Sequence, residues 1–366
     1  MQQKKKPGTP VRKGQPQSKS QPQKKSQPQN RAQSANKVNS PKSVQSAKKA
    51  QPKKKEQPIQ PVQTPDGVTS QNGVTSQNNE DKIRGSVIQW YPGHMTGALR
   101  MMQESIKLID IVIELLDARV PLSSKNPDID KLAKGKFRLI IMNKIDLADP
   151  ALTKRWKAYY EGKGFSVILM DSRSRKDAAA VSGVVREVCK EKLERDRSRG
   201  ILGSSIKAMI VGIPNVGKST FINAFSGKAS TKTGNKPGVT RGKQWIKIAK
   251  DMDLLDTPGI LWPKFEDQMV GKRLAWIGSI NDDILEKTEL ALDLLVILQK
   301  TYCNILKERY KITEGMSGIE ALYQIAEVRK CLKKGNEPDI DKAAVLLLDD
   351  LRSGRLGRIT LEEPEQ

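Results

Sequence analysis

The chain has 366 residues, a formal net charge of +24 and three cysteines, so it has room for two domains and is strongly basic. Cys189, Cys303 and Cys331 lie far apart with no second ligand type beside them, which argues against a disulfide framework and a metal site. No apolar run approaches the ~18 residues of a membrane span, so we expect no membrane partner and a cytoplasmic protein.

Residues 1–80 contain no Leu, Phe, Tyr or Trp and are rich in Gln, Lys, Ser and Pro. Such a segment cannot bury enough apolar surface to offset the entropy of ordering, so we predict a disordered tail over residues 1–85. Residues 1–55 hold 16 Lys and Arg and no acidic residue. A flexible polycation adds salt-sensitive affinity for phosphate backbones, and a tail that only aids solubility is the alternative.

The run Gly212-Ile213-Pro214-Asn215-Val216-Gly217-Lys218-Ser219 has the spacing of a phosphate-binding loop. It follows a strand-like segment, residues 206–211, and precedes a helix-like one, residues 220–225, as this motif requires. Lys218 would reach the β- and γ-phosphates and Ser219 would hold Mg²⁺. Backbone N–H groups and the helix N-terminus would hold the β-phosphate. The predicted phosphate contacts are Asn215, Val216, Gly217, Lys218, Ser219 and Thr220.

A second motif, Asn143-Lys144-Ile145-Asp146, follows the apolar strand predicted over residues 138–142. The Asp146 carboxylate can accept from both N1–H and N2–H₂ of guanine, a pair of donors that adenine lacks. Asn143 can hold the loop and reach the O6/N7 edge, while the Lys144 stem lies over the ring. Ser172, after the strand predicted over residues 166–170, is the candidate backbone donor to O6. This motif argues against an ATP-using kinase or ATPase.

Two later segments are predicted to sense the γ-phosphate. Thr240 lies in a turn-prone loop and would complete the Mg²⁺ coordination, with a plain surface threonine as the alternative. Residues 245–248 and 252–255 read as a hairpin whose second strand delivers Asp256-Thr257-Pro258-Gly259. Asp256 would hold Mg²⁺ through water, and the Gly259 N–H would touch the γ-phosphate, so this loop changes shape when that phosphate leaves.

Near-continuous apolar strands alternate with helices, which predicts an α/β fold with a parallel sheet covered on both faces. In most GTPases the phosphate loop precedes the guanine-reading motif, and here the order is reversed. We therefore predict a circularly permuted P-loop GTPase domain over residues 86–275 and a C-terminal all-helical domain over residues 276–366. The switch segment leads directly into these helices, so loss of the γ-phosphate can reorient them.

The last predicted helix should end at Gly354, and basic side chains gather there. Arg352, Arg355 and Arg358 would form a cluster suited to RNA phosphates. A solvated helix end is the alternative interpretation.

The permuted order and several motifs together resemble the bacterial ribosome biogenesis GTPase A family over residues 86–362. The motifs are Trp90-Tyr91-Pro92-Gly93-His94-Met95, Asp117-Ala118-Arg119-Val120-Pro121, Asn126-Pro127, the phosphate loop, and Asp256-Thr257-Pro258-Gly259-Ile260-Leu261-Trp262-Pro263-Lys264. The resemblance implies a GTPase that acts late in assembly of the large ribosomal subunit, with C-terminal helices that contact ribosomal RNA.

The resemblance also implies roles for single residues. Ile260 stands where Ras-like enzymes place a water-orienting Gln, so another group must position the attacking water. His94, the only histidine, maps to a family histidine that either orients water or anchors the N-terminal segment. Asn215 matches a family asparagine associated with K⁺ beside the phosphates. The expected catalytic residues are therefore His94, Lys218, Thr240 and Gly259.

We therefore expect a monomeric, Mg²⁺- and K⁺-dependent GTP hydrolase. It would bind the large-subunit precursor and its rRNA in the GTP state and be released on hydrolysis. The alternative is an RNA-binding assembly scaffold in which GTP occupancy alone sets the affinity.

Overall fold

The computed structural model describes residues 91–365 except 202, 228–242 and 282–284. The predicted tail and Thr240 lie outside the described residues. Within the described part, no helix is both long and apolar enough to cross a membrane.

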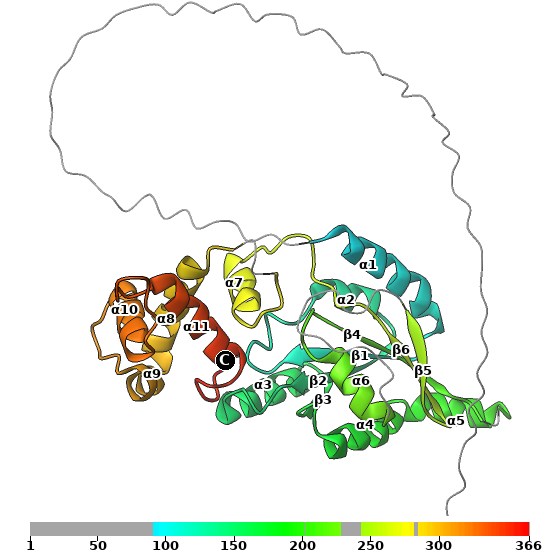
Figure 1. Ribbon diagram of the computed structural model, residues 1–366. Coiled ribbons are helices and arrows are strands. Elements are labelled where there is room, and N and C mark those ends of the chain that lie inside the picture. The colour runs from blue at the N-terminus through cyan, green and yellow to red at the C-terminus, as the bar shows by residue number, and fades with distance from the viewer. Residues whose placement is uncertain (1–90, 202, 228–242, 282–284, 366) are drawn as a thin grey trace, which may run out of the picture. The chain divides into compact units, whose positions relative to one another are not determined.

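A six-stranded sheet forms the centre of this part, in the order β3-β2-β1-β4-β6-β5 (Figure 1). All neighbouring strands are parallel except β5, which pairs antiparallel with β6 as the predicted hairpin. The parallel α/β fold is thereby confirmed. The strands are β1 (Ile111–Asp117), β2 (Phe137–Asn143), β3 (Ser166–Leu169), β4 (Ile206–Gly212), β5 (Gln244–Ala249) and β6 (Met252–Asp256).

Strand order explains why motifs far apart in the sequence come together. The guanine-reading motif follows β2, and the phosphate loop follows β4, with only β1 between these two strands. The segment 256–259 follows β6, the other neighbour of β4. Because the carboxyl ends of parallel strands meet at one edge of a sheet, all of these segments lie at the same edge.

Helices cover both faces of the sheet. Alternate residues of β2 point to opposite faces, so Ile140 and Met142 pack with Trp156 of α3, while Leu139 and Ile141 join the larger core that includes α4 and α6. The helices of this part are α1 (Gly93–Ser105), the 3₁₀ turn η1 (Ile106–Leu108), α2 (Pro127–Leu132), α3 (Pro150–Gly162), α4 (Arg175–Val188), α5 (Lys190–Ser198), α6 (Lys218–Ser226) and α7 (Gln268–Trp276).

A helical C-terminal part was predicted, and the described residues after α7 form the helices α8 (Lys287–Thr301), α9 (Cys303–Tyr310), α10 (Gly318–Val328) and α11 (Ile340–Arg352). The buried residues of α8 and α11 include Leu294, Leu298, Leu347 and Leu351. Gly354 follows α11 with φ +76, a left-handed conformation that suits glycine at a helix end. The Trp276 indole N–H donates to the Leu290 carbonyl (2.8 Å), so the end of α7 is attached to α8. The predicted domain boundary at residue 275 stays a prediction.

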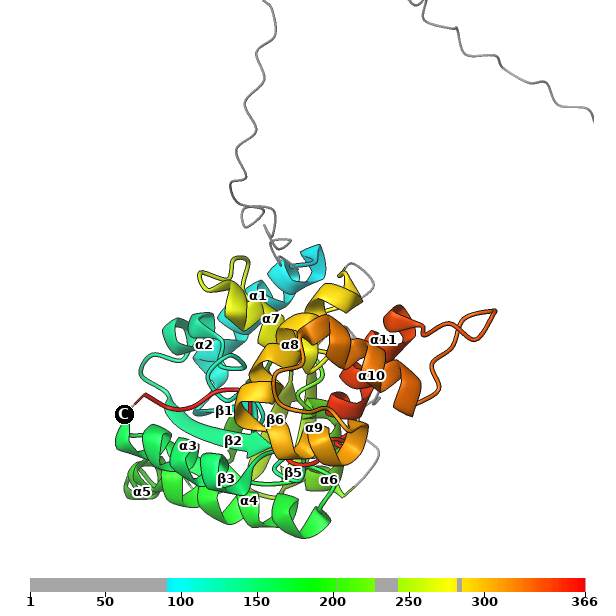
Figure 2. The ribbon, with the colours of Figure 1, turned by 90° about the vertical axis from the view of Figure 1, so that its left-hand side faces the viewer.

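The last residues return to the sheet, which the sequence did not indicate. The Leu361 N–H donates to the Arg119 carbonyl (2.8 Å), and the Trp156 indole donates to the Glu362 carbonyl (3.1 Å). Figure 2 shows this segment in red, running back toward α3. The Glu362 carboxylate accepts from the Ser123 N–H and hydroxyl, and burial raises its pKa despite these bonds and the nearby Arg273. The C-terminal segment therefore packs beside the loops that follow β1 and β2.

Candidate nucleotide-binding site

The phosphate loop has backbone geometry that only glycine tolerates at two points. Gly212 ends β4 with φ +149, and a Cβ there would lie 2.7 Å from the Leu115 carbonyl oxygen. Gly217 precedes α6 with φ +106. Between them Asn215 takes a left-handed φ of 58°. The loop therefore turns sharply into the N-terminus of α6, where backbone N–H groups and the helix dipole favour an anion.

Lys218 is buried and folds back over its own loop. Its ammonium donates to the carbonyls of Gly212 and Ile213, both at 2.9 Å. Burial lowers the pKa of Lys218 to about 8, although Asp256 opposes that shift. A phosphate placed in the loop would supply this buried ammonium with a negative partner.

Asn143 joins three predicted segments. Its side-chain amide donates to the Val216 carbonyl (2.7 Å), and its Oδ1 accepts from the Ser172 N–H (2.8 Å). A Cβ on Gly217 would lie 2.4 Å from Asn143 Nδ2. Asn143 therefore holds the phosphate loop beside the end of β3, and the Ser172 N–H is engaged with Asn143 in this arrangement.

Lys144, with φ 62°, crosses from the guanine motif to the phosphate loop. Its ammonium donates to the Asn215 carbonyl (2.7 Å) and pairs with Asp117 Oδ2 (2.9 Å). Burial lowers the pKa of Lys144, and Asp117 opposes that shift. The sequence motif that contains Asp117 gave no indication of a role for its side chain. Its position could have been anticipated, because β1 ends beside β2 and Asp117 is level with Asn143.

Asp146 lies at the outer side of this site with its side chain 26 % exposed. Its Oδ2 accepts from the Arg173 guanidinium at 2.6 Å. Arg173 also donates to both carboxylate oxygens of Asp171. Asp146 is therefore a partly exposed carboxylate, with one oxygen paired with Arg173 in this arrangement.

Asp256, which the sequence predicts to hold Mg²⁺ through water, ends β6. It is 1 % exposed, and its Oδ1 has no hydrogen-bond partner among the described residues. Burial raises the pKa of Asp256 to about 6, although Lys218 opposes the shift. A buried carboxylate oxygen without a partner fits a hydrated hard cation, which prefers oxygen ligands. Ser219 and Asp256 would hold that ion, and Thr240 lies outside the described residues.

The segment after Asp256 approaches the phosphate loop through its backbone. A Cβ on Gly259 would lie 2.9 Å from both Lys218 Nζ and Pro214 Cα. Ile260 is 1 % exposed, its N–H donates to the Gly212 carbonyl (3.3 Å), and its own carbonyl accepts from Asn126 Nδ2 (3.5 Å). Residue 260 therefore offers no polar side chain to a water molecule.

His94 lies in the first turn of α1 and is exposed. Its neighbour Met95 is fully buried, and the Met95 sulfur accepts from the Leu261 N–H at 3.4 Å. Met95, rather than His94, therefore anchors the start of α1 to the segment after Gly259.

Two arginines of the predicted RNA-binding cluster, Arg352 and Arg355, have partners within the chain, and RNA binding by the cluster stays a prediction. Arg352 turns inward and donates to the carbonyls of Trp276 (3.0 Å) and Ala275 (2.8 Å). Arg355 forms an ion pair with the buried Asp350. The pattern of spacing gave no sign that these carbonyls and this carboxylate lie within reach.

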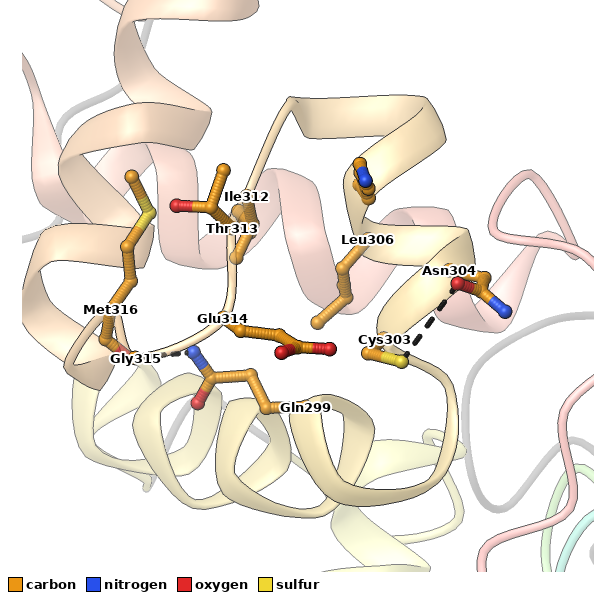
Figure 3. Close-up of a pocket in the computed structure, with 10 residues that line it drawn as sticks. Gln299, Cys303, Asn304, Leu306, Ile312, Thr313, Glu314, Gly315 and Met316 are labelled. Carbon is orange, nitrogen blue, oxygen red and sulfur yellow. Dashed lines mark hydrogen bonds between the residues drawn. The ribbon is translucent and has the colours of Figure 1, made fainter.

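A separate cavity of about 550 Å³ lies among the C-terminal helices (Figure 3). Gln299 of α8 closes one side by donating to the Met316 carbonyl at 2.8 Å. None of the predicted nucleotide residues lines it. The cavity is therefore distinct from the site at the sheet edge.

Comparisons with known proteins agree with this geometry. A family profile described as "50S ribosome-binding GTPase" matches residues 207–328. Ribosome biogenesis GTPase A of Bacillus cereus is 49 % identical over 281 residues, which span 76 % of this chain and 95 % of that protein. The chain belongs to the ribosome biogenesis GTPase A family. The predicted resemblance is thereby confirmed.

Solved structures of the family support the fold. The GDP-bound structure of the Thermotoga maritima protein YlqF is 28 % identical and covers 72 % of this chain and 99 % of its own, with a TM-score of 0.53. The GNP-bound crystal structure of that protein is 29 % identical, covers 74 % and 99 %, and has a TM-score of 0.52. The sheet edge described above is thus part of a P-loop GTPase fold.

Proposed function

We propose that the chain is a GTP hydrolase that acts in assembly of the large ribosomal subunit. The observation that carries this proposal is the position of Asn143. Its amide holds the phosphate loop at Val216, and its oxygen holds the end of β3 at Ser172, so the base-reading and phosphate-binding segments form one site. Belonging to the ribosome biogenesis GTPase A family adds the ribosomal partner.

The proposed nucleotide contacts follow from this arrangement. Asp146 reads N1–H and N2–H₂ of guanine, and Lys144 lies over the base. The phosphates lie on the loop from Asn215 to Thr220, with Lys218 turned from its own carbonyls to the β- and γ-phosphates. Bound Mg²⁺, held by Ser219, Asp256 and Thr240, would stabilise negative charge on the phosphate oxygens. Gly259 donates its N–H to the γ-phosphate.

Water must be positioned without a polar side chain at residue 260. We assign this role to His94, because it is exposed and its neighbour Met95 contacts Leu261 in the switch segment. His94→Ala is expected to lower the GTP turnover by about tenfold, as loss of a positioned polar group does, while the affinity for GDP stays the same. Thr96→Ala, at another exposed position of the same helical turn, is the control. If the His94 variant and wild type turned over GTP at the same rate, another group would have to position the water.

K⁺ beside Asn215 would supply positive charge that other GTPases obtain from an arginine. The GTP-bound chain binds the large-subunit precursor and its rRNA, and hydrolysis releases it. These steps predict slow hydrolysis by the chain alone and faster hydrolysis on its partner.

The test is the GTP hydrolysis rate with and without purified large ribosomal subunits, in K⁺ and in Na⁺ at fixed ionic strength. A stimulation of at least about tenfold by large subunits is expected in K⁺, and it should be lost in Na⁺. Lys218→Ala reports any contaminating GTPase. A rate that large subunits leave unchanged in both salts would contradict the proposed function.

A further inference from the structure

Two hydrogen bonds of Asn215 connect the phosphate loop with other parts of the chain, one through its side chain and one through its backbone. Its side-chain amide donates to the carbonyl of Gly278 (2.7 Å), two residues beyond the end of α7. Its carbonyl accepts from Lys144 (2.7 Å). The phosphate loop is therefore held from two sides at a single residue.

The contact through Lys144 continues across a buried ion pair. Asp117 accepts from Lys144 and, through both of its oxygens, from Arg119 (2.9 and 2.8 Å). Asp117 and Arg119 are at most 1 % exposed. Burial would raise the pKa of Asp117, but Arg119 and Lys144 hold that pKa below its usual range, so the carboxylate stays charged.

Arg352 of α11 closes the connection into a ring. Its carbonyl accepts from Arg119 Nη1 at 3.4 Å, while its guanidinium donates to Trp276 and Ala275, at the end of α7. A Cβ on Gly278 would lie 3.5 Å from Arg352 Nε, so Gly278, whose carbonyl Asn215 contacts, lies beside the same guanidinium. We call this set the polar ring; its members are Asn215, Gly278, Arg352, Arg119, Asp117 and Lys144.

We propose that Arg119 and Arg352 are positioning residues for the nucleotide reaction, which set the conformation of the phosphate loop at Asn215 according to the placement of α11. This inference rests on the proposed GTPase function. Neither arginine belongs to a nucleotide-binding motif. Each guanidinium makes at least two hydrogen bonds at once, and that of Arg119 joins Asp117 to the Arg352 carbonyl, a geometry that fixes relative position more than it adds stability.

Reciprocity gives the polar ring a functional consequence. If a nucleotide in the loop changes the preferred position of α11, then a partner that holds α11 changes the nucleotide affinity by the same factor. Contact between the C-terminal helices and the ribosomal partner would thereby change the nucleotide affinity, although no residue of the partner enters the site.

The experiment measures GDP dissociation and GTP turnover of Arg352→Ala. We expect a threefold to tenfold change in the GDP dissociation rate, in the range typical of coupling between sites, at unchanged secondary structure. Arg352→Lys should behave like Arg352→Ala, because a single ammonium cannot make both carbonyl bonds in the same geometry. If Arg352→Ala does not fold, Arg352→Lys takes its place in the same comparison.

The matched control is Arg355→Ala. Arg355 lies three residues further along, and its partner Asp350 is also bound by Arg309 and Tyr310, all within the C-terminal helices. Its nucleotide kinetics should stay within about twofold of wild type, as expected for a site outside the ring. Equal effects of Arg352→Ala and Arg355→Ala would overturn the proposal, since both would then report general destabilisation.

A double-mutant cycle adds a readout that a structural role would not move. Asp117→Asn and Arg352→Ala should be clearly non-additive in their effects on GDP dissociation, because each breaks the same ring. Additive effects, or an Arg352→Ala rate within about twofold of wild type, would contradict the inference while the GTPase function stands. A wild-type chain that binds no guanine nucleotide would instead remove the proposed function itself.

Discussion

The two ends of the nucleotide site are built differently. At the base end, the side chains of Asn143 and Lys144 already hold the phosphate loop through the carbonyls of Val216 and Asn215. At the γ-phosphate end, the described residues meet the loop through a close backbone approach at Gly259 and one backbone hydrogen bond from Ile260. The base end is therefore joined to the phosphate loop by side-chain hydrogen bonds, whereas the γ-phosphate end meets that loop through its backbone.

Because the two ends differ in this way, substitutions at each end should have different effects. Changes at the base end should weaken GTP and GDP binding equally, because both nucleotides carry the same base. Changes at the phosphate end should alter hydrolysis and the discrimination between GTP and GDP, because only GTP carries the γ-phosphate.

Asp146→Asn should have the largest effect. The variant replaces a two-oxygen acceptor by an amide, so one guanine donor loses its partner and the affinity for GTP and GDP should fall by roughly a hundredfold or more. Xanthine nucleotides should bind better than guanine nucleotides, because xanthine offers a carbonyl where guanine offers its amino group. Fluorescence titration with both nucleotide types measures this.

The control for that variant is Arg173→Ala, which removes the ion pair with Asp146 and leaves the acceptor in place. It should retain the guanine preference. An Asp146→Asn protein that prefers guanine would show that another residue reads the base.

Gly217→Ala should have the next largest effect, because it disrupts the contact between Asn143 and the phosphate loop. The new Cβ would lie 2.4 Å from Asn143 Nδ2, and residue 217 has φ +106. We expect a loss of about 2–3 kcal/mol in the free energy of unfolding, from left-handed strain and the displaced Asn143 bond, and an equal loss of GTP and GDP affinity. Denaturant unfolding and nucleotide titration measure both.

Gly227→Ala is a matched control, because Gly227 ends the same helix with φ +68 and a Cβ there would meet nothing within 4 Å. It should cost only the left-handed strain of about 1–2 kcal/mol. If both variants lose the same stability and keep the same affinity, Asn143 does not depend on close contact with residue 217.

The sequence predicted the features that local patterns determine. The strand before Asn143 and the strand and helix around the phosphate loop were predicted within one to two residues, because apolar runs end where the motifs begin. A capping box at Ser317 and Glu320 marks the start of α10, so the sequence also contains the local signal for where this helix begins.

The contacts that were missed join residues far apart in the chain. Arg352 was assigned to an RNA-binding cluster because spacing cannot reveal the carbonyls of Ala275 and Trp276, which α7 brings within reach. The hydrogen bond between Leu361 and Arg119 joins segments far apart in the chain, and no local pattern encodes it. Pairing of Asp117 with Lys144 lies between these cases, since it follows from strand order once β1 is placed beside β2.

Gly259→Ala tests the phosphate end and should have a smaller effect on binding. A Cβ would lie 2.9 Å from Pro214 N and Cα, so the segment must move away from the phosphate loop. We expect GTP turnover to fall about tenfold or more, through loss of the N–H contact to the γ-phosphate, with GDP affinity changed by less than about threefold. Single-turnover hydrolysis and GDP titration separate these effects. If GDP affinity fell as much as GTP turnover, residue 259 would act on nucleotide binding as the base-end residues do, and the expected difference between the two ends would be wrong at this position.

The smallest effect is expected from pH acting on Glu362, beside the loop that follows β1. Burial raises the pKa of Glu362, so the folded state binds this proton more tightly than the unfolded state. Its stabilising contribution is present below the unfolded pKa of about 4.3 and is lost as pH rises through the raised folded pKa, by at most about 1.4 kcal/mol per pH unit. Relative to Glu362→Gln, wild type should therefore lose stability from pH 4.3 upward and then level off. Thermal unfolding of both proteins over that range measures the difference, and Glu363→Gln, at a side chain 60 % exposed, should follow wild type throughout. Parallel curves for wild type and Glu362→Gln would mean that the carboxyl group titrates alike in the folded and unfolded states.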